Sequence, residues 1–350
     1  TTIVPNTIIE RKGVKTGLIT TRGFKDVLEI GRQKRYDLYD LFIDKPQPLI
    51  PRYLIEEVAE RVSAAGEIVH ALEPEDVRAA LRRLRALGVQ SVAVCLLHAY
   101  ANSVHERLVE SIIREEAPDL PVSLSSDVSP KYREYERTNT VSANAYVIPI
   151  VASYLRRLGA ELEQKGFQKQ FYIMQSNGGV ATPDLMERYP VRFVESGPAA
   201  GVLAAGLLRE VRGEESLISF DMGGTTAKMC LIESGRPAIT NEFEVDRFRF
   251  KHGSGLPLNI SAIDLIEIGA GGGSIARTSM GTIAVGPESA GADPGPVCYG
   301  RGGKEPTVTD ANLVLGYLNP AFFLGGKMNL DYEGARDAIE RRIGAPLPQR

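Results

Sequence analysis

The first half of the chain alternates apolar runs, typical of buried strands, with stretches whose apolar residues recur at helical spacing. Within residues 73–87, Val77, Leu81 and Leu84 lie three or four positions apart, which predicts an amphipathic helix. Gly88 then precedes an apolar run typical of a buried strand. The expected elements are strands at 15–20, 89–97 and 121–127, and helices at 73–87 and 102–116. Their alternation predicts an α/β sheet.

The second half contains longer apolar segments and then becomes rich in glycine. Residues 132–166 predict one or two helices interrupted at Pro149, and residues 169–175 predict a strand that ends in Ser-Asn-Gly-Gly. Residues 196–212 predict a helix that begins with Ser-Gly-Pro and is otherwise rich in small and aliphatic residues. We expect this helix to connect two domains. The expected division is a first domain at 1–195, a connector at 196–214 and a second domain at 215–350.

Composition excludes several classes of protein. The net charge of -3 gives no electrostatic footprint for nucleic acid or for an anionic membrane, and the apolar runs are too short to span a bilayer. The three cysteines, Cys95, Cys230 and Cys298, show no metal-binding spacing and favour a reducing cytoplasm. The chain begins at Thr1 without methionine, and it ends soon after a helical run at 332–342. We therefore expect it to be an internal piece of a longer protein.

The strongest chemical signal is the segment LISFDMGGTTAKMCLIE at 217–233, in which two apolar runs flank a Gly-Gly turn. Because a strand follows the glycines, the segment is neither a P-loop nor a Rossmann fingerprint, which both need a helix there. Backbone N–H groups and hydroxyls in such a turn suit a phosphate. The expected contacts are Gly223, Gly224, Thr225 and Thr226. The alternative is a plain β-hairpin with a glycine turn.

Asp221 stands at the carboxyl end of the first strand of this hairpin. A carboxylate at this position is placed to hold a magnesium-bound water or to orient an attacking group. Magnesium suits the position because it keeps most of its waters and takes few protein ligands. Asp221 is therefore our candidate catalytic and metal-binding residue.

Two further glycine-rich segments follow. In the first, residues 264–276, the glycines remove side chains where something flat or a backbone must pass, and a bulged strand corner is the alternative. In the second, residues 289–303, Asp293 is a candidate to orient substrate or metal, and Arg301 is a candidate to bind a phosphate or carboxylate. Cys298 is expected to be a buried structural thiol, because no charged neighbour favours its thiolate. Asp310 and Asn312 are expected to cap the helix that follows.

The chain resembles the hydantoinase A/oxoprolinase family, within the actin, sugar kinase and Hsp70 superfamily. The hairpin sequence Asp-Met-Gly-Gly-Thr-Thr is similar to the second phosphate-binding hairpin of that superfamily. Eight further blocks match the family in the correct order over most of the chain. They are TTRGFKDVLEIGRQ at 20–33, CLLHAYAN at 95–102, REYERTNT at 133–140, MQSNGG at 174–179, SGPAAG at 196–201, IGAGGGSIA at 268–276, SAGADPGPVCYGRGG at 289–303 and PTVTDANLVLG at 306–316.

The resemblance implies a two-domain ribonuclease H-like fold, as in actin-like ATPases, with ATP in the cleft and the connector helix as hinge. It also implies that a glycine-rich loop contacts the nucleotide. The residues of this loop are Gly269, Gly271, Gly272, Gly273 and Ser274. The cofactors it implies are ATP and Mg²⁺, with Mg²⁺ at Asp221.

Three functions remain open at this point. The first is ATP-dependent ring opening of a cyclic amide of the 5-oxoproline or hydantoin type, by phosphorylation of the amide oxygen, with a hydantoinase B-like partner. The second is the ATP-using subunit of an acetone- or acetophenone-type ketone carboxylase. The third is a nucleotide-binding piece that has no activity by itself.

The sequence also departs from the family pattern. The family's first phosphate hairpin is absent, and Thr1-Thr2 resembles the end of a His-Gly-Thr-Thr segment. Many members carry Asp at the position of Lys228 and His at the position of Glu267, and these groups are associated with a metal in part of the family. Their replacement argues against a metal at that spot. We expect the 350 residues alone to be folded and catalytically inactive.

Overall fold

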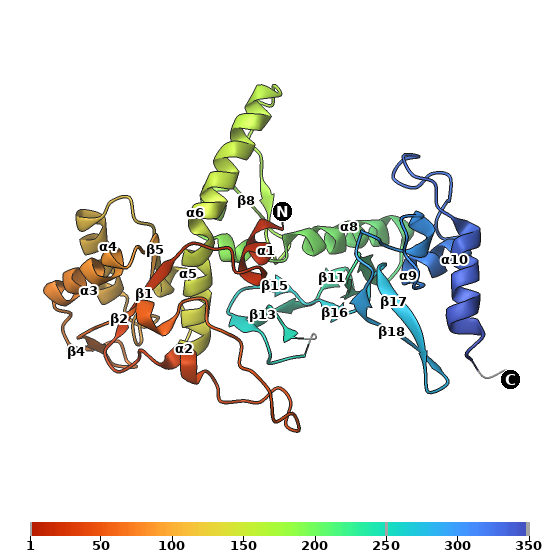
Figure 1. Ribbon diagram of the computed structural model, residues 1–350. Coiled ribbons are helices and arrows are strands. Elements are labelled where there is room, and N and C mark those ends of the chain that lie inside the picture. Colours follow the sequence, from red (N-terminus) through yellow and green to blue (C-terminus); the bar gives the residue numbers. More distant parts are fainter. Residues whose placement is uncertain (1, 249–250, 348–350) are drawn as a thin grey trace. The chain divides into compact units, whose positions relative to one another are not determined.

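The computed structural model describes residues 2–248 and 251–347, which form two compact units (Figure 1). Unit 1 comprises Thr1–Leu207 and Pro237–Asp264, and unit 2 comprises Leu208–Arg236 and Leu265–Arg350. Helix α8, Ser196–Arg212, begins in unit 1 and ends in unit 2. The observed division differs from the expected second domain at 215–350 in one segment, residues 237–264, which pack with unit 1.

Unit 1 is built on a four-stranded parallel sheet with the strand order β2–β1–β5–β6. The strands are β1 at Thr16–Thr21, β2 at Ile55–Val58, β5 at Ser91–Cys95 and β6 at Val122–Leu124. Every residue of β1 and β5 is buried, as in central strands that are covered on both faces. The α/β sheet predicted from the alternation of helices and strands is confirmed.

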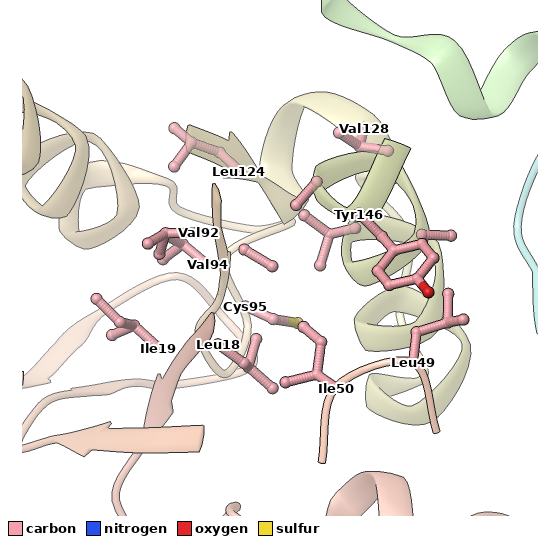
Figure 2. Packing of buried hydrophobic residues seen from close by; sticks show 14 of the residues in the cluster. Leu18, Ile19, Leu49, Ile50, Val92, Val94, Cys95, Leu124, Val128 and Tyr146 are labelled. Atoms are coloured by element: carbon pink, nitrogen blue, oxygen red, sulfur yellow. The ribbon is translucent and has the colours of Figure 1, made fainter. Parts of the chain in front are cut away.

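Helices cover this sheet, with α3 and α4 on one side and α6 on the other (Figure 1). The helices are α3 at Pro74–Ala86, α4 at Val104–Glu116 and α6 at Glu134–Gln164. Figure 2 shows the core of the unit, in which Leu18 of β1 and Cys95 of β5 lie in one cluster with Tyr146 of α6. The N-cap position of α4 is Ser103, and Asn102, one residue before it, accepts a hydrogen bond from the N–H of Val104 at 3.1 Å.

Helix α6 continues unbroken through Pro149, so the interruption expected there is wrong. A proline removes one backbone donor and normally kinks or breaks a helix. Here every residue from Glu136 to Val147 is buried, and packing of this segment against the sheet offsets the local cost. The buried Asn144 adds a polar tie, because its amide donates to Ser123 Oγ of β6 at 2.9 Å.

Residues 237–264 belong to unit 1 because their apolar side chains complete its core. Val245, Leu256 and Leu258 are buried in the same cluster as the central sheet. The N–H of Asn259 donates to Thr140 Oγ1 of α6 at 2.8 Å. A single domain boundary after helix α8 therefore places residues 237–264 in the second domain, although they pack in unit 1.

The other elements of unit 1 are short. They are α1 at Ile3–Ile9, α2 at Val27–Ile30, a 3-10 turn at Arg52–Leu54, β3 at Arg61–Val62, β4 at Ile68–His70, α5 at Ser125–Val128, β7 at Ile173–Met174, β8 at Val180–Ala181, α7 at Pro183–Arg188, a 3-10 turn at Pro190–Phe193, β12 at Ile239–Thr240, β13 at Phe243–Val245, β14 at Leu256–Leu258 and β15 at Ala262–Ile263. The strand expected at 169–175 is thus reduced to the two residues of β7, which pair with β8.

Unit 2 contains two antiparallel hairpins and a small helical cluster (Figure 1). Its elements are β9 at Ser216–Met222, β10 at Ala227–Glu233, β11 at Arg236–Pro237, β16 at Ile266–Ile268, β17 at Ser274–Ser279, β18 at Thr282–Ser289, a 3-10 turn at Val297–Tyr299, α9 at Val308–Val314, α10 at Tyr332–Ile339 and a π-helical turn at Glu340–Gly344. Within the described parts of both units, no helix has the length and apolar character needed to cross a membrane.

Candidate nucleotide site

The phosphate hairpin, residues 216–233, has the strand–turn–strand form expected from the sequence. Strands β9 and β10 pair in antiparallel register from Ser216 opposite Glu233 to Met222 opposite Ala227. The N–H of Gly223 donates to the carbonyl oxygen of Thr226 at 2.9 Å and closes the turn. The turn is therefore held by its own backbone before any ligand binds.

The glycine loop, residues 269–274, lies directly on this turn. The N–H of Gly272 donates to the carbonyl oxygen of Gly223 at 2.9 Å, and the N–H of Gly273 donates to that of Gly224 at 2.8 Å. A Cβ atom on Gly271 would lie 2.6 Å from the backbone nitrogen of Thr225. The sequence predicted that a flat group or a backbone passes the glycines, and the observed neighbour is the backbone of the hairpin.

Four further hydrogen bonds fix the loop, one within it and three from other segments. Ser274 Oγ accepts from the N–H of Gly271 at 2.8 Å, which gives this predicted site residue a role inside the loop. The backbone N–H and the hydroxyl of Thr309 both donate to the carbonyl oxygen of Gly272 at 2.8 Å. The N–H of Ala290 donates to the carbonyl oxygen of Gly273 at 2.8 Å. The loop is thus tied to the hairpin, to α9 and to the segment after β18.

The donors of the hairpin turn are arranged differently from those of the glycine loop. The N–H groups of Gly271, Gly272 and Gly273 all donate within the protein. In contrast, the N–H groups of Gly224 and Thr225 and the hydroxyls of Thr225 and Thr226 have no hydrogen-bond partner in the part of the chain that the structure describes. Gly224 and Thr225 are exposed. The turn therefore presents several donors to solvent from a rigid support.

A row of charged residues crosses the sheet beside this turn. Lys228 of β10 lies opposite Asp221 of β9 and opposite Glu267 of β16, and residues in opposite positions place their side chains on the same face. Lys228 Nζ lies 2.9 Å from Glu267 Oε1, and the two side chains are 19% and 18% exposed. Sequence reasoning treated these two positions only as departures from a pattern. The pairing of β9, β10 and β16 brings these two side chains beside Asp221. No local sequence pattern indicates that pairing.

The candidate substrate residues of the second glycine-rich segment are less closely joined to the hairpin. Ala290 contacts the glycine loop, as described above, but Asp293 and Arg301 are exposed. No hydrogen bond or ion pair connects either side chain to the hairpin among residues 2–248 and 251–347. The structure therefore brings together the phosphate and glycine-loop residues, and it leaves these two at the periphery.

Cys298 and Asp310 have the structural roles expected of them. Cys298 is buried, and burial together with the nearby charge of Asp310 raises the pKa of its thiol. Asp310 is fully buried and accepts from the N–H of Cys298 at 2.7 Å and from the N–H of Thr307 at 2.8 Å. With Thr307 it forms the capping box that begins α9. This carboxylate is fully engaged in holding the loop against the helix.

The acidic groups of the described residues do not form a metal cage. In these ranges, no group of three or more His, Cys, Asp and Glu side chains has the geometry to hold a metal ion. Magnesium, however, commonly binds through one or two carboxylates together with waters and substrate phosphates. The single exposed carboxylate of Asp221 is compatible with that mode of binding.

The close contact at Gly271 generates a prediction about stability. In Gly271→Ala, the new Cβ meets the backbone of the hairpin turn, so the turn must shift, and we expect a cost of about 1–3 kcal/mol in the free energy of unfolding. Gly224→Ala is the matched control, because a Cβ atom on Gly224 would meet no heavy atom within 4 Å beyond its chain neighbours. Thermal unfolding of both variants measures the difference. Equal midpoints would show that the contact does not constrain the turn.

Comparisons with known proteins identify relatives that match almost the whole chain. The model of the family described as hydantoinase/oxoprolinase matches residues 137–349, and the model of its N-terminal region matches residues 1–117. Caprolactamase subunit alpha of Pseudomonas jessenii is 39% identical over 350 residues, which cover 99% of this chain and 49% of that protein. The acetophenone carboxylase gamma subunit of Aromatoleum aromaticum is 37% identical over 363 residues, which cover 99% of this chain and 48% of that subunit.

A solved structure is similar as well. The crystal structure of ATP-dependent caprolactamase from Pseudomonas jessenii matches with a TM-score of 0.84 and 38% sequence identity, covering 99% of this chain and 50% of that chain. The chain thus spans about half the length of the curated relatives it matches. Since the family model covers more than half of the residues in one continuous match, the chain belongs to the hydantoinase/oxoprolinase family.

Proposed function

We propose that this chain supplies the ATP-binding and phosphoryl-transfer part of an enzyme that opens a cyclic amide of the 5-oxoproline or hydantoin type. The family membership and the similarity to a caprolactamase, itself an enzyme of a cyclic amide, support this substrate class. The solved relative is ATP-dependent, which supports ATP as the nucleotide. A hydantoinase B-like partner subunit or domain is proposed to complete the enzyme, which we place in the cytoplasm.

The observation that carries the proposal is the set of donors on the phosphate hairpin that have no partner among the described residues. Two backbone N–H groups and two hydroxyls are available on a turn that the glycine loop holds in place. Successive N–H groups of this kind form an anion-binding nest. Donors that are already oriented need no reorganisation when charge develops, which is the main source of electrostatic catalysis. In this proposal the hairpin binds phosphate, and the glycine loop supports it from behind.

The proposed chemistry is activation of an amide oxygen. The oxygen attacks the γ-phosphorus of ATP and ADP leaves; water then adds to the ring carbon and the C–N bond breaks, while the ring nitrogen takes up a proton. The resulting acyl phosphate is hydrolysed by a second water to a carboxylate and phosphate. The task of this chain is positioning and charge neutralisation, as in phosphoryl transfer generally.

Asp221 and Lys228 have separate roles in this proposal. Asp221, exposed at the end of β9, would hold Mg²⁺, which would supply neutralisation of the phosphate charge. Lys228 lies in the strand between Asp221 and Glu267 and forms an ion pair with Glu267. Its ion pair with Glu267 limits the positions that the ammonium group can take. Asp293 and Arg301 remain proposals as substrate residues, without a contact to the hairpin to support them.

A second candidate is the ATP-using subunit of a ketone carboxylase. The similarity to an acetophenone carboxylase gamma subunit favours it, and the same hairpin would serve to phosphorylate a carbonyl oxygen. A third candidate is a nucleotide-binding piece that is inert alone. Because the chain spans about half of its relatives, we expect residues 1–350 by themselves to show no substrate-stimulated ATP hydrolysis. Steady-state ADP release, with and without cyclic amides, measures this.

We expect Asp221→Asn in the complete enzyme to lower turnover by at least about a hundredfold and to leave the fold intact, because the side chain is exposed and the amide has nearly the same size as the carboxylate. The measurement is ADP release with 5-oxoproline, hydantoin, ε-caprolactam, and ketones plus bicarbonate, with the partner present. Asp337→Asn, at an exposed carboxylate of α10, is the control. Near-normal turnover in Asp221→Asn would refute its role.

Nucleotide binding is tested at the turn itself. Gly224→Val places a branched side chain in open space, so we expect normal stability and at least tenfold weaker binding of a non-hydrolysable ATP analogue. Calorimetry of the complete protein with the analogue and magnesium measures the affinity. Unchanged affinity would mean that the hairpin is only structural.

A further inference from the structure

Unit 1 contains a cavity that the phosphate hairpin does not use. Its volume is about 330 Å³, within the range of small-molecule sites. Residues 28–36 and 45–48, the start of α6 at Tyr135 and Glu136, and residues 242–244 and 252–259 line it. Two blocks that the sequence singled out, 20–33 and 133–140, therefore meet at this cavity although they are a hundred positions apart in the chain.

An ion pair forms the most buried polar part of the wall. Arg32 Nε donates to Glu136 Oε1, and the side chain of Glu136 is 5% exposed while that of Arg32 is 35% exposed. The hydrogen bond to Glu136 raises the pKa of Arg32, so the guanidinium keeps its charge. A guanidinium has five N–H donors and a carboxylate accepts about four hydrogen bonds, so one contact leaves both groups able to bind more. The cavity wall thus presents a hydrogen-bond donor, Arg32, next to an acceptor, Glu136.

The charged side chains that line the cavity are balanced in number, with Arg32, Lys34, Arg35 and Lys45 on one side and Glu29, Glu136, Glu242 and Glu244 on the other. Arg133 Nη1 lies 3.0 Å from Glu242 Oε1, and His252 Nδ1 lies 3.2 Å from Glu244 Oε1. Glu244 also accepts from the N–H of Gly253 at 2.8 Å. The apolar part of the wall includes Leu28, Phe243 and Pro257. Such a wall suits a small ring that has apolar atoms and one polar edge.

We infer that this cavity binds the cyclic amide, whose amide edge is recognised by Arg32 and Glu136. A ring holds its amide in the cis form, so the carbonyl oxygen and the N–H lie on one edge. Arg32 donates to the oxygen, and Glu136 accepts from the N–H. A ketone has no such N–H and leaves the buried carboxylate of Glu136 without that partner, which disfavours its binding. This inference rests on the proposed function and adds the place and the chemical basis of substrate choice.

The first test compares ligands on the unaltered complete protein with its partner. Calorimetry measures the affinities of ε-caprolactam, 5-oxoproline and hydantoin, and of the N-methyl derivative of whichever binds most tightly. Methylation removes the N–H, so we expect binding at least about tenfold weaker, the size expected for a lost hydrogen bond to a charged group. Equal affinity of the N-methyl derivative, or no binding by any of the three amides, overturns the inference.

The second test changes the pair. We expect Glu136→Gln and Arg32→Ala each to weaken cyclic amide binding at least about tenfold and to leave the affinity for an ATP analogue within about twofold. Glu56→Gln is the matched control, because it breaks an Arg–Glu pair with Arg83 (2.7 Å) elsewhere in unit 1. If Glu136→Gln does not fold, the inference is tested by Arg32→Ala together with the ligand comparison, because Arg32 is the more exposed member of the pair. Affinities equal to the unaltered protein in the folded variants overturn the inference.

The two proposals fail in different ways. The function is tested by ADP release stimulated by a cyclic amide, and the cavity by the affinity for that amide. If a cyclic amide stimulates ADP release and the Arg32 and Glu136 variants bind it normally, only the assignment of the cavity is overturned. Amide binding that depends on Arg32 and Glu136 but stimulates no ADP release removes the proposed reaction and leaves the binding site.

Discussion

The close approach of two backbones in unit 2 is the constraint on which the candidate nucleotide site depends. The hydrogen bonds from Gly272 and Gly273 to the carbonyls of Gly223 and Gly224 hold the glycine loop on the hairpin turn, and a side chain at Gly271 would collide with that turn. Because the loop satisfies its own N–H groups in this way, it has few donors to offer a ligand. The exposed donors belong to the turn alone, which is therefore the part that is suited to an anion.

Local patterns predicted the elements well because each depends on neighbouring residues. Helix α8 has the predicted bounds, Ser196–Arg212, and the strand–turn–strand order around Gly223-Gly224 was evident from two apolar runs. Predictions were wrong or incomplete where packing between distant segments prevailed. Burial of the first half of α6 carries the helix through Pro149, and the side chains of residues 237–264 complete the core of unit 1.

The same limit applies to the candidate sites. The sequence identified the hairpin and the glycine loop, since their glycines and hydroxyls are contiguous, but it could not join Lys228 to Glu267, which depends on the pairing of β10 with β16. It matched the block at 133–140 to the family without giving that block a role. The ion pair of Glu136 with Arg32 brings that block to a cavity, and no spacing rule relates two residues so far apart in the chain.

The two candidate sites differ in the way their polar groups are satisfied, and this difference matches the two reactants of the proposed reaction. The hairpin turn has several donors without a partner in the described residues, an arrangement that attracts a polyanion such as a nucleotide phosphate. The cavity of unit 1 is lined by equal numbers of basic and acidic side chains, and its most buried charged pair is Arg32 with Glu136. Each site would thus disfavour the other's ligand: a neutral amide gains little from a turn built for charge, and a polyanion would have to displace the ion pairs of the cavity. In the proposed reaction, selectivity of this kind would let one chain hold both reactants without competition between them.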